Sequence, residues 1–123
     1  MNYLLDTCVF IWAMANPNKL SLNTKSIILD RLNNIYISSI TPWKITIKKS
    51  LGKLTCPDNI EELIKINDFK ELPINFKHVL ELKKLPLHHK DPFDRMIIAQ
   101  ARVENLTILT DDEKFRDYDV KVG

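Results

Sequence analysis

The sequence predicts an α/β fold in which a mostly parallel sheet lies between layers of helices. Short, β-rich apolar runs alternate with helix-like segments along the chain, and this order is typical of a parallel sheet covered by helices on both sides. Residues that favour helix N-termini stand where one kind of segment gives way to the other. The 123 residues include only two glycines and no visible linker or repeat, so we expect one domain over residues 1–123.

The first strand and the first two helices follow from hydropathy and capping signals. Residues 2–5, NYLL, fit a buried strand, and residues 8–15, CVFIWAMA, fit a short apolar helix that ends near Pro17. Ser21 is well placed to cap a second helix. The apolar face of this second helix is expected to consist of four residues: Leu22, Ile28, Leu29 and Leu32.

The next strand and helix carry the most informative stretch of the sequence. Residues 34–40, NIYISSI, are predicted to form a strand. Thr41 as a cap and Pro42 at the first helical position then predict a helix to about Leu51. Its large apolar residues recur every four positions and are expected to face the core: Trp43, Ile47 and Leu51. Lys44 and Lys48 would then share the adjacent face.

The second half of the chain repeats the alternation of helices and strands. Asp91 followed by Pro92 has the same cap-then-proline pattern and predicts the start of a long helix. The expected elements, in order, are a helix capped by Asp58, a strand within residues 69–74, a helix over 75–85, the helix that Asp91 opens, and strands within 107–112 and 119–122.

Composition restricts the classes of partner and compartment. Eighteen basic and sixteen acidic residues give a net charge of +2, which neither demands nor excludes a nucleic-acid partner. No apolar run reaches the roughly 18 residues of a membrane span, and the N-terminal segment has an acid and no basic leader. Cys8 and Cys56 lack metal-binding spacing and are expected to be reduced thiols. We therefore expect a cytoplasmic protein with no membrane partner.

Aspartates stand at the ends of two predicted strands and in the first turn of a helix. Asp6 ends the first strand, Asp111 and Asp112 end a later one, and Asp94 begins the long helix. Ligands of open parallel sheets bind beyond the carboxyl ends of the strands, where strand order reverses, so these acids can meet at one rim. Clustered carboxylates need a neutralising cation, and Mg²⁺ or Mn²⁺ takes oxygen ligands of this kind. Such a site supports metal-assisted phosphodiester hydrolysis.

Each aspartate also has a simpler interpretation. Asp6 and Asp94 can serve as capping acids and nothing more, and Asp111 and Asp112 can be turn residues or a cap for the next segment. Asp91 is expected to be a structural cap. A phospho-acceptor signalling domain also gathers acids at strand ends, but it needs an aspartate after a middle strand, and YISSI ends in none.

Four segments together resemble the PIN-domain family, and most closely its VapC-type toxins: LLDTCVFIW, ISSITPWKITIKKSLGKL, LPLHHKDPFDRMIIAQA and LTILTDDEKF. The resemblance covers essentially the whole chain in the right order and spacing. It implies a PIN-like three-layer sandwich and a Mg²⁺- or Mn²⁺-dependent endoribonuclease, the toxin of a type II toxin–antitoxin system. It also implies three partners: an RNA substrate, a second copy of the chain, and a cognate antitoxin whose C-terminal segment fills the active-site groove.

The resemblance places the catalytic and metal-binding acids at Asp6, Asp94 and Asp112. Asp111 occupies a variable position of the family pattern and ranks second. Two hydroxyl groups, on Thr7 and Thr110, are expected to point towards the carboxylates. Each of these two threonines is equally well explained as a turn residue.

The chain departs from the family pattern at one functional position. The family's second acid is the glutamate of S-x-x-x-W-E-I-x-I-K, and this chain reads SSITPWKITIK, with Lys44 in its place. Trp43, Ile45, Ile47 and Lys48 keep the register. Exchanging one carboxylate for an ammonium changes the formal charge of the site from −4 to −2. We therefore expect divalent metal binding to be weak or absent and ribonuclease activity to be impaired.

Two arrangements of Lys44 and two functions follow. Lys44 either pairs with Asp6 or Asp94 in place of the metal, or bends outward while another acid serves. The chain is then either an impaired endoribonuclease toxin or an inactive PIN module that binds antitoxin or RNA without cleaving. Lys48 and Arg95 are candidate contacts to RNA phosphates, which would be independent of base sequence. A solvated helix face is the alternative for these basic residues.

Overall fold

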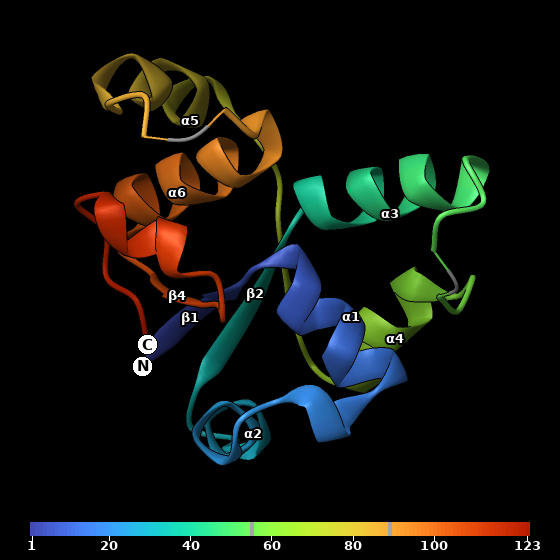
Figure 1. The fold of residues 1–123 in the computed structure, drawn as a ribbon. Helices are drawn as coiled ribbons and strands as arrows, with labels where there is room; N and C mark the ends of the chain where they lie inside the picture. Colours follow the sequence, from blue (N-terminus) through green and yellow to red (C-terminus); the bar gives the residue numbers. More distant parts are fainter. Residues whose placement is uncertain (55, 89) are drawn as a thin grey trace.

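The computed structural model describes residues 1–54, 56–88 and 90–123, in which four parallel strands lie between layers of helices (Figure 1). The predicted α/β sandwich is confirmed. The strands are β1 (Asn2–Leu5), β2 (Asn34–Ser38), β3 (Lys70–Leu72) and β4 (Thr107–Leu109). The α-helices are α1 (Thr7–Ala15), α2 (Leu22–Leu29), α3 (Ile40–Ser50), α4 (Ile60–Ile66), α5 (Phe76–Glu81) and α6 (Pro92–Glu104). Three 3₁₀ helices complete the described part: η1 (Pro17–Lys19), η2 (Leu82–Lys84) and η3 (Glu113–Asp117).

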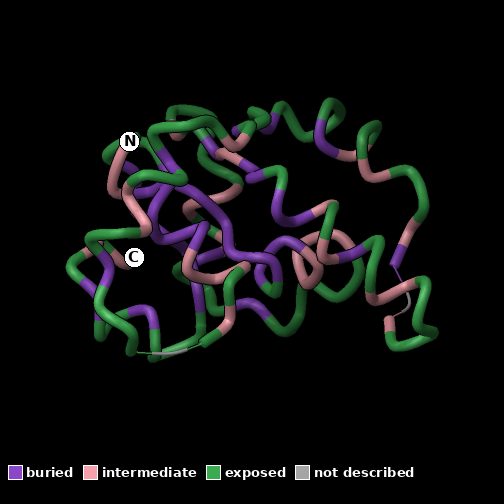
Figure 2. Tube along the Cα trace, turned by 90° about the horizontal axis from the view of Figure 1, so that it is seen from above, coloured by how far each residue is buried: buried purple, intermediate pink, exposed green. Residues whose placement is uncertain are grey.

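The sheet separates two apolar layers because successive side chains of a strand point to opposite faces. Leu4 of β1 packs with the apolar residues of α6, whereas its neighbours Tyr3 and Leu5 pack with residues of α1 and α4. Ile45 of α3 belongs to the second layer. In Figure 2 the buried segments run through the middle of the molecule, with exposed segments around them. Helices α5 and α6 lie on one side of the sheet, and α1, α2 and α4 on the other (Figure 1).

Strand order reverses at β1. The order β3-β2-β1-β4 means that the chain builds outward from β1 through β2 to β3 and then places β4 on the other side of β1. All of these pairings are parallel, so the carboxyl ends of the strands share one edge. The backbone N–H of Asp6 donates to the carbonyl of Leu109 at 3.1 Å, which holds the segments after β1 and β4 side by side. This edge is where an open parallel sheet binds its ligands.

The start of α6 is the predicted one. The Asp91 carboxylate accepts the N–H groups of Phe93 and Asp94, and Pro92 occupies the first helical position. At the other end, Asn105 takes a left-handed conformation with φ of 56°, and its N–H bonds to the carbonyl of Ala101. Helix α6 is therefore fixed at both ends by local sequence.

Helix α3 begins earlier than predicted and presents a different face to the core. Ser39, not Thr41, occupies the N-cap position, because the Ser38 hydroxyl accepts the N–H of Ile40 and starts the helix there. Trp43 is 55% exposed and Leu51 62%, so the prediction that these residues face the core is wrong. The buried residues are Ile40, Thr41 and Ile45.

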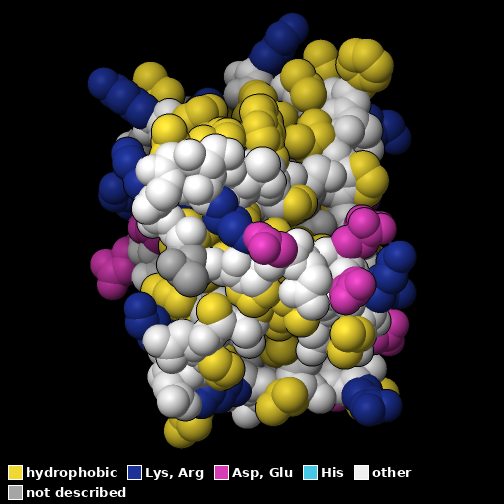
Figure 3. Space-filling model, turned by 90° about the vertical axis from the view of Figure 1, so that its right-hand side faces the viewer, with side chains coloured by type: hydrophobic (Ala, Val, Ile, Leu, Met, Phe, Trp, Pro, Cys, Tyr) yellow, Lys and Arg dark blue, Asp and Glu magenta, His cyan; other side chains and the backbone are white. Residues whose placement is uncertain are grey.

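Two series with helical spacing run along α3. One is apolar (Trp43, Ile47 and Leu51) and the other is polar (Thr41, Lys44 and Lys48), and spacing alone does not tell which of them faces inward. The polar series is the more buried one. Thr41 is buried, and Lys44 and Lys48 are half-buried, as is usual for lysines whose aliphatic side chains pack along a protein surface. The apolar series lies outward. Figure 3 shows the side of the molecule that carries α3, and hydrophobic side chains gather in the upper part of this face.

The apolar face predicted for α2 is only partly correct. Ser21 caps α2 as predicted, but Leu22, Leu29 and Leu32 are exposed, and Ile27 and Ile28 supply its contacts to the core. Leu32 lies beyond the end of α2 at Leu29 and so does not belong to the face of this helix.

Asp58 does not cap α4, where Asn59 holds the cap position, because the Asp58 carboxylate bonds the Lys49 ammonium. Residues 119–122 form no strand of their own, and Val122 makes a single parallel bridge to Ile108.

Cys8 and Cys56 are free thiols, as predicted. Within the described part of the chain, none of the helices combines the length and hydrophobicity that a bilayer crossing requires.

The orientation of α3 predicts opposite consequences for two isoleucines one half-turn apart. Ile45 is fully buried, so Ile45→Ala should lower the free energy of unfolding by about 2–5 kcal/mol. Ile47 is 36% exposed, and Ile47→Ala should cost less than about 1 kcal/mol. Urea denaturation of the two variants measures both values. A larger loss for Ile47→Ala would mean that α3 is rotated and that its lysines face solvent.

Candidate functional site

The three predicted acids line one hollow at the carboxyl ends of β1 and β4. Asp6 follows β1, Asp112 follows β4, and Asp94 lies in the first turn of α6. The hollow has a volume of about 340 Å³ and is also lined by Asp111 and by Lys44 of α3. The convergence expected from the strand ends is therefore observed, at the point where strand order reverses.

Asp6 is both a helix cap and a member of the cluster. Its Oδ1 accepts the N–H of Val9 at 2.7 Å, and its Oδ2 accepts the hydroxyl of Thr110. Burial raises the pKa of Asp6 from 3.8 to about 6, although the bonds from Thr110 and Val9 lower it. The carboxylates of Asp94 and Asp111 make a smaller contribution to this raised pKa. Capping and clustering are thus not alternatives for this residue.

Thr110 joins the ends of the two central strands. Its hydroxyl donates to Asp6 and accepts the N–H of Asp112 at 3.0 Å. It therefore has the orientation towards a carboxylate that the sequence predicted. Asp112 uses an oxygen to accept the N–H of Lys114 at 3.0 Å and so caps η3. The other predicted hydroxyl, on Thr7, lies 3.3 Å from the hydroxyl of Thr41 and links α1 to α3.

Lys44 points into the site. Its ammonium lies 3.4 Å from Asp91 Oδ2 and 3.9 Å from Asp94 Oδ1, and 5.8 Å from the centre of the Phe93 ring. The side chain is only 16% exposed. The expected pairing with Asp94 is present, and the outward-bending alternative is wrong. The pairing with Asp91 was not predicted.

Asp91 is more than the structural cap that the sequence indicated. Burial alone would raise the pKa of this carboxyl, but the N–H of Asp94, the Lys44 ammonium and the N–H of Phe93 together hold the pKa below its usual value. Asp91 therefore remains charged and couples the first turn of α6 to the lysine of α3.

These side chains do not fit a divalent metal ion as they are arranged. Within residues 1–54, 56–88 and 90–123, no group of three or more His, Cys, Asp or Glu side chains could hold one. Both oxygens of Asp6 accept hydrogen bonds, and an oxygen of Asp94 faces the Lys44 ammonium. The ammonium also repels a second cation.

Of the two residues predicted to contact RNA, one has another role in the fold. The Arg95 guanidinium donates to the carbonyl of Pro86 at 2.8 Å, the carbonyl of Leu85 at 3.4 Å and the Tyr118 hydroxyl at 3.2 Å. It therefore ties the chain after η2 to the C-terminal segment. Lys48 lies one turn beyond Lys44 on α3 and is half-buried.

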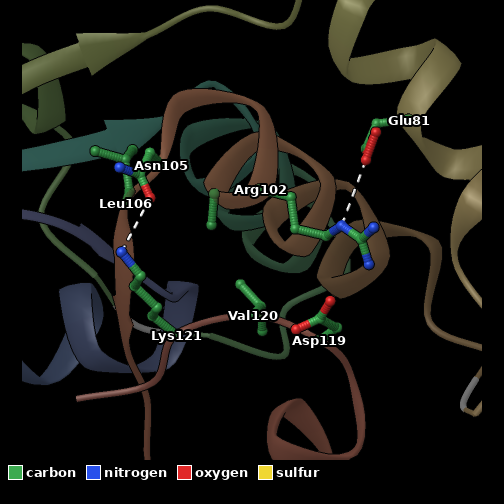
Figure 4. A pocket seen from close by; sticks show the side chains of 8 residues that line it. Glu81, Arg102, Asn105, Leu106, Asp119, Val120 and Lys121 are labelled. Atoms are coloured by element: carbon green, nitrogen blue, oxygen red, sulfur yellow. Dashed lines mark hydrogen bonds and ion pairs between the residues drawn. The ribbon is translucent and has the colours of Figure 1, made fainter.

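A separate hollow of about 380 Å³ lies at the far end of α6 (Figure 4). Its basic groups are already engaged. Arg102 Nε lies 3.3 Å from Glu81 Oε2, and Lys121 Nζ donates to Asn105 Oδ1 at 3.1 Å. This hollow is therefore less suited to bind a charged ligand than the acid-lined one.

The start of α3 is positioned by buried polar contacts that were not predicted from the sequence. Gln100 of α6 is fully buried; its Oε1 accepts the Ser38 hydroxyl, and its Nε2 donates to the carbonyl of Leu72 at 3.3 Å. Since Ser38 also accepts the N–H of Ile40, this network fixes the start of the helix that carries Lys44. The available signal was a single polar residue inside the apolar run MIIAQA, because buried polar groups need partners.

The family model of the PIN domain matches residues 3–121. The chain therefore belongs to the PIN-domain family, whose members are generally nucleases. A search of curated protein sequences gave no match.

Solved structures share the fold at low sequence identity. VapBC2 from Rickettsia felis, bound to a DNA fragment from its promoter, has a TM-score of 0.73 and 21% identity, over 99% of this chain and 96% of that one. DNA-bound VapBC from Salmonella typhimurium has a TM-score of 0.71 and 18% identity, over 100% and 97%. FitAcB from Neisseria gonorrhoeae has a TM-score of 0.64 and 19% identity, over 98% and 95%.

The raised pKa of Asp6 predicts a pH dependence of stability. The folded chain binds this proton more tightly than the unfolded chain, so the associated stabilisation is fully present below about pH 4 and is lost as pH rises through about 6. Asp6→Asn can keep the cap and the contact to Thr110 but cannot titrate. Relative to this variant, wild type should lose on the order of 3 kcal/mol of unfolding free energy between about pH 4 and pH 7.

Urea denaturation at the two pH values measures the difference. Asp117→Asn, on an exposed turn of η3, serves as the control and should follow wild type. Parallel pH profiles for wild type and Asp6→Asn would show that Asp6 titrates at its ordinary pKa.

Proposed function

We propose that this chain is the toxin of a type II toxin–antitoxin pair, built as a metal-dependent endoribonuclease whose activity Lys44 suppresses. The observation that carries the proposal is the position of the Lys44 ammonium, 3.9 Å from Asp94 in a hollow lined by Asp6 and Asp112. Membership of the PIN-domain family supports hydrolysis of nucleic acid.

The three aspartates come from three different elements and would bind the metal together. Asp6 follows β1, Asp94 lies in the first turn of α6, and Asp112 follows β4, and all three line the hollow. In a site with the full set of acids, they would hold Mg²⁺ or Mn²⁺ together with a glutamate at position 44. Here Lys44 removes that ligand and adds a positive charge, so the wild-type chain is expected to cleave RNA slowly or not at all.

The partners are an RNA substrate and an antitoxin. Lys48, one turn beyond Lys44 on α3, would contact phosphate groups, which gives binding that depends on salt and not on base sequence. The similarity to solved toxin–antitoxin structures supports an antitoxin partner. We further propose that the protein is cytoplasmic, with reduced thiols, and acts as a homodimer.

A second candidate is a catalytically inactive PIN module that binds antitoxin or RNA without cleaving. The double pairing of Lys44 with Asp91 and Asp94 favours it. Cleavage assays of wild type with and without EDTA separate the two candidates, since slow metal-dependent cleavage supports the first and none supports the second.

Lys44→Glu should restore metal-dependent cleavage. The substitution removes the ammonium and supplies the missing carboxylate, so the rate of RNA cleavage in Mg²⁺ should rise at least about tenfold over wild type and vanish in EDTA. Lys44→Gln is the matched control, because it removes the charge without adding a ligand, and it should gain much less. The proposal fails if Lys44→Glu cleaves no faster than wild type.

A further inference from the structure

We propose that the Lys44 ammonium is a built-in cation that replaces a metal ion in stabilising this fold. The inference deepens the proposed function because it concerns the same site. Its test measures stability and metal binding and does not depend on RNA cleavage.

The Lys44 ammonium lies close to two carboxylates and one aromatic ring. It lies 3.4 Å from an oxygen of Asp91 and 3.9 Å from an oxygen of Asp94, so one positive charge serves two carboxylates. The Phe93 ring lies beside it at 5.8 Å, and Trp43 packs edge-to-face on Phe93 with ring centres 5.0 Å apart. Shielded pairs of this kind interact more strongly than pairs on an open surface.

The Lys44 ammonium faces a cluster of negatively charged carboxylates. Asp6, Asp94, Asp111 and Asp112 line one hollow, and Asp91 lies next to it. Gathered carboxylates repel one another unless a cation neutralises them. Among the residues that the structure describes, no side-chain group could hold a metal there. Lys44 supplies a positive charge to the lining of this hollow.

The ion pairs of Lys44 also join two helices. Lys44 belongs to α3, whereas Asp91 is the N-cap of α6 and Asp94 lies in its first turn, so these contacts link two helices that are far apart in sequence. A metal ion must bind from solution, and its contribution to stability depends on its concentration. The Lys44 ammonium is covalently attached to the chain, so its contribution to stability does not depend on the concentration of any ion.

The stability of the wild-type protein should therefore be independent of divalent metal. Thermal unfolding is measured in EDTA and in millimolar MnCl₂ for wild type, Lys44→Glu and Lys44→Gln. The Tm of wild type should change by less than about 1 °C between the two conditions. Lys44→Glu should unfold at a lower temperature than wild type in EDTA, because it removes the ammonium and adds a fifth carboxylate to the four that line the hollow. Mn²⁺ should raise its Tm by roughly 5 °C in a saturable way.

Lys44→Gln separates the loss of the cation from the gain of a ligand. It should also unfold below the Tm of wild type, but Mn²⁺ should restore less of its Tm than it restores for Lys44→Glu. Electron paramagnetic resonance of free Mn²⁺ gives a second readout, with saturable binding to Lys44→Glu and none to wild type.

Saturable Mn²⁺ binding by wild type, or an equal rise in Tm for wild type and Lys44→Glu, would overturn the inference. If Lys44→Glu does not fold, Lys44→Gln still tests the inference, because a Tm in EDTA equal to that of wild type would overturn it. Metal-dependent stability of Lys44→Glu without RNA cleavage would leave the inference intact and remove the proposed nuclease function.

Discussion

The ion pairs between Lys44 and the first turn of α6 determine the character of this site. An open parallel sheet whose strand order reverses at β1 brings acids from distant segments to one edge. Such an edge needs a positive charge, and here a side chain of α3 supplies it. The same contacts that neutralise the carboxylates also join α3 to α6, so electrostatics and packing depend on one residue.

Local structure and site chemistry use the same groups. Asp6 caps α1, Asp91 caps α6, and Asp112 caps η3, while Asp6 and Asp112 also line the hollow. A cap fixes the position of a carboxylate through backbone N–H groups, which is a rigid support for a charged site. Thr110 extends this support, because its hydroxyl bonds the carboxylate of Asp6 and the backbone of Asp112. The acids are therefore held in place by helix caps and by the ends of β1 and β4.

Sequence reasoning worked where one local rule decides the outcome. Asp91 with Pro92 predicted the start of α6, and the apolar runs predicted the strands, because capping and strand burial depend on neighbouring residues. It failed for the face of α3, where an apolar and a polar series have the same period and tertiary contacts decide between them. The pairing of Lys44 with Asp91 was also missed, because two residues 47 positions apart meet only once α3 and α6 are placed.

The most direct test of this account is a crystal structure of the wild-type protein soaked in MnCl₂, with the anomalous signal of manganese recorded. The account predicts that the Lys44 ammonium stays between Asp91 and Asp94 and that no anomalous peak lies within coordinating distance of Asp6, Asp94 or Asp112. A manganese ion bound to these aspartates, with Lys44 displaced from the hollow, would contradict it.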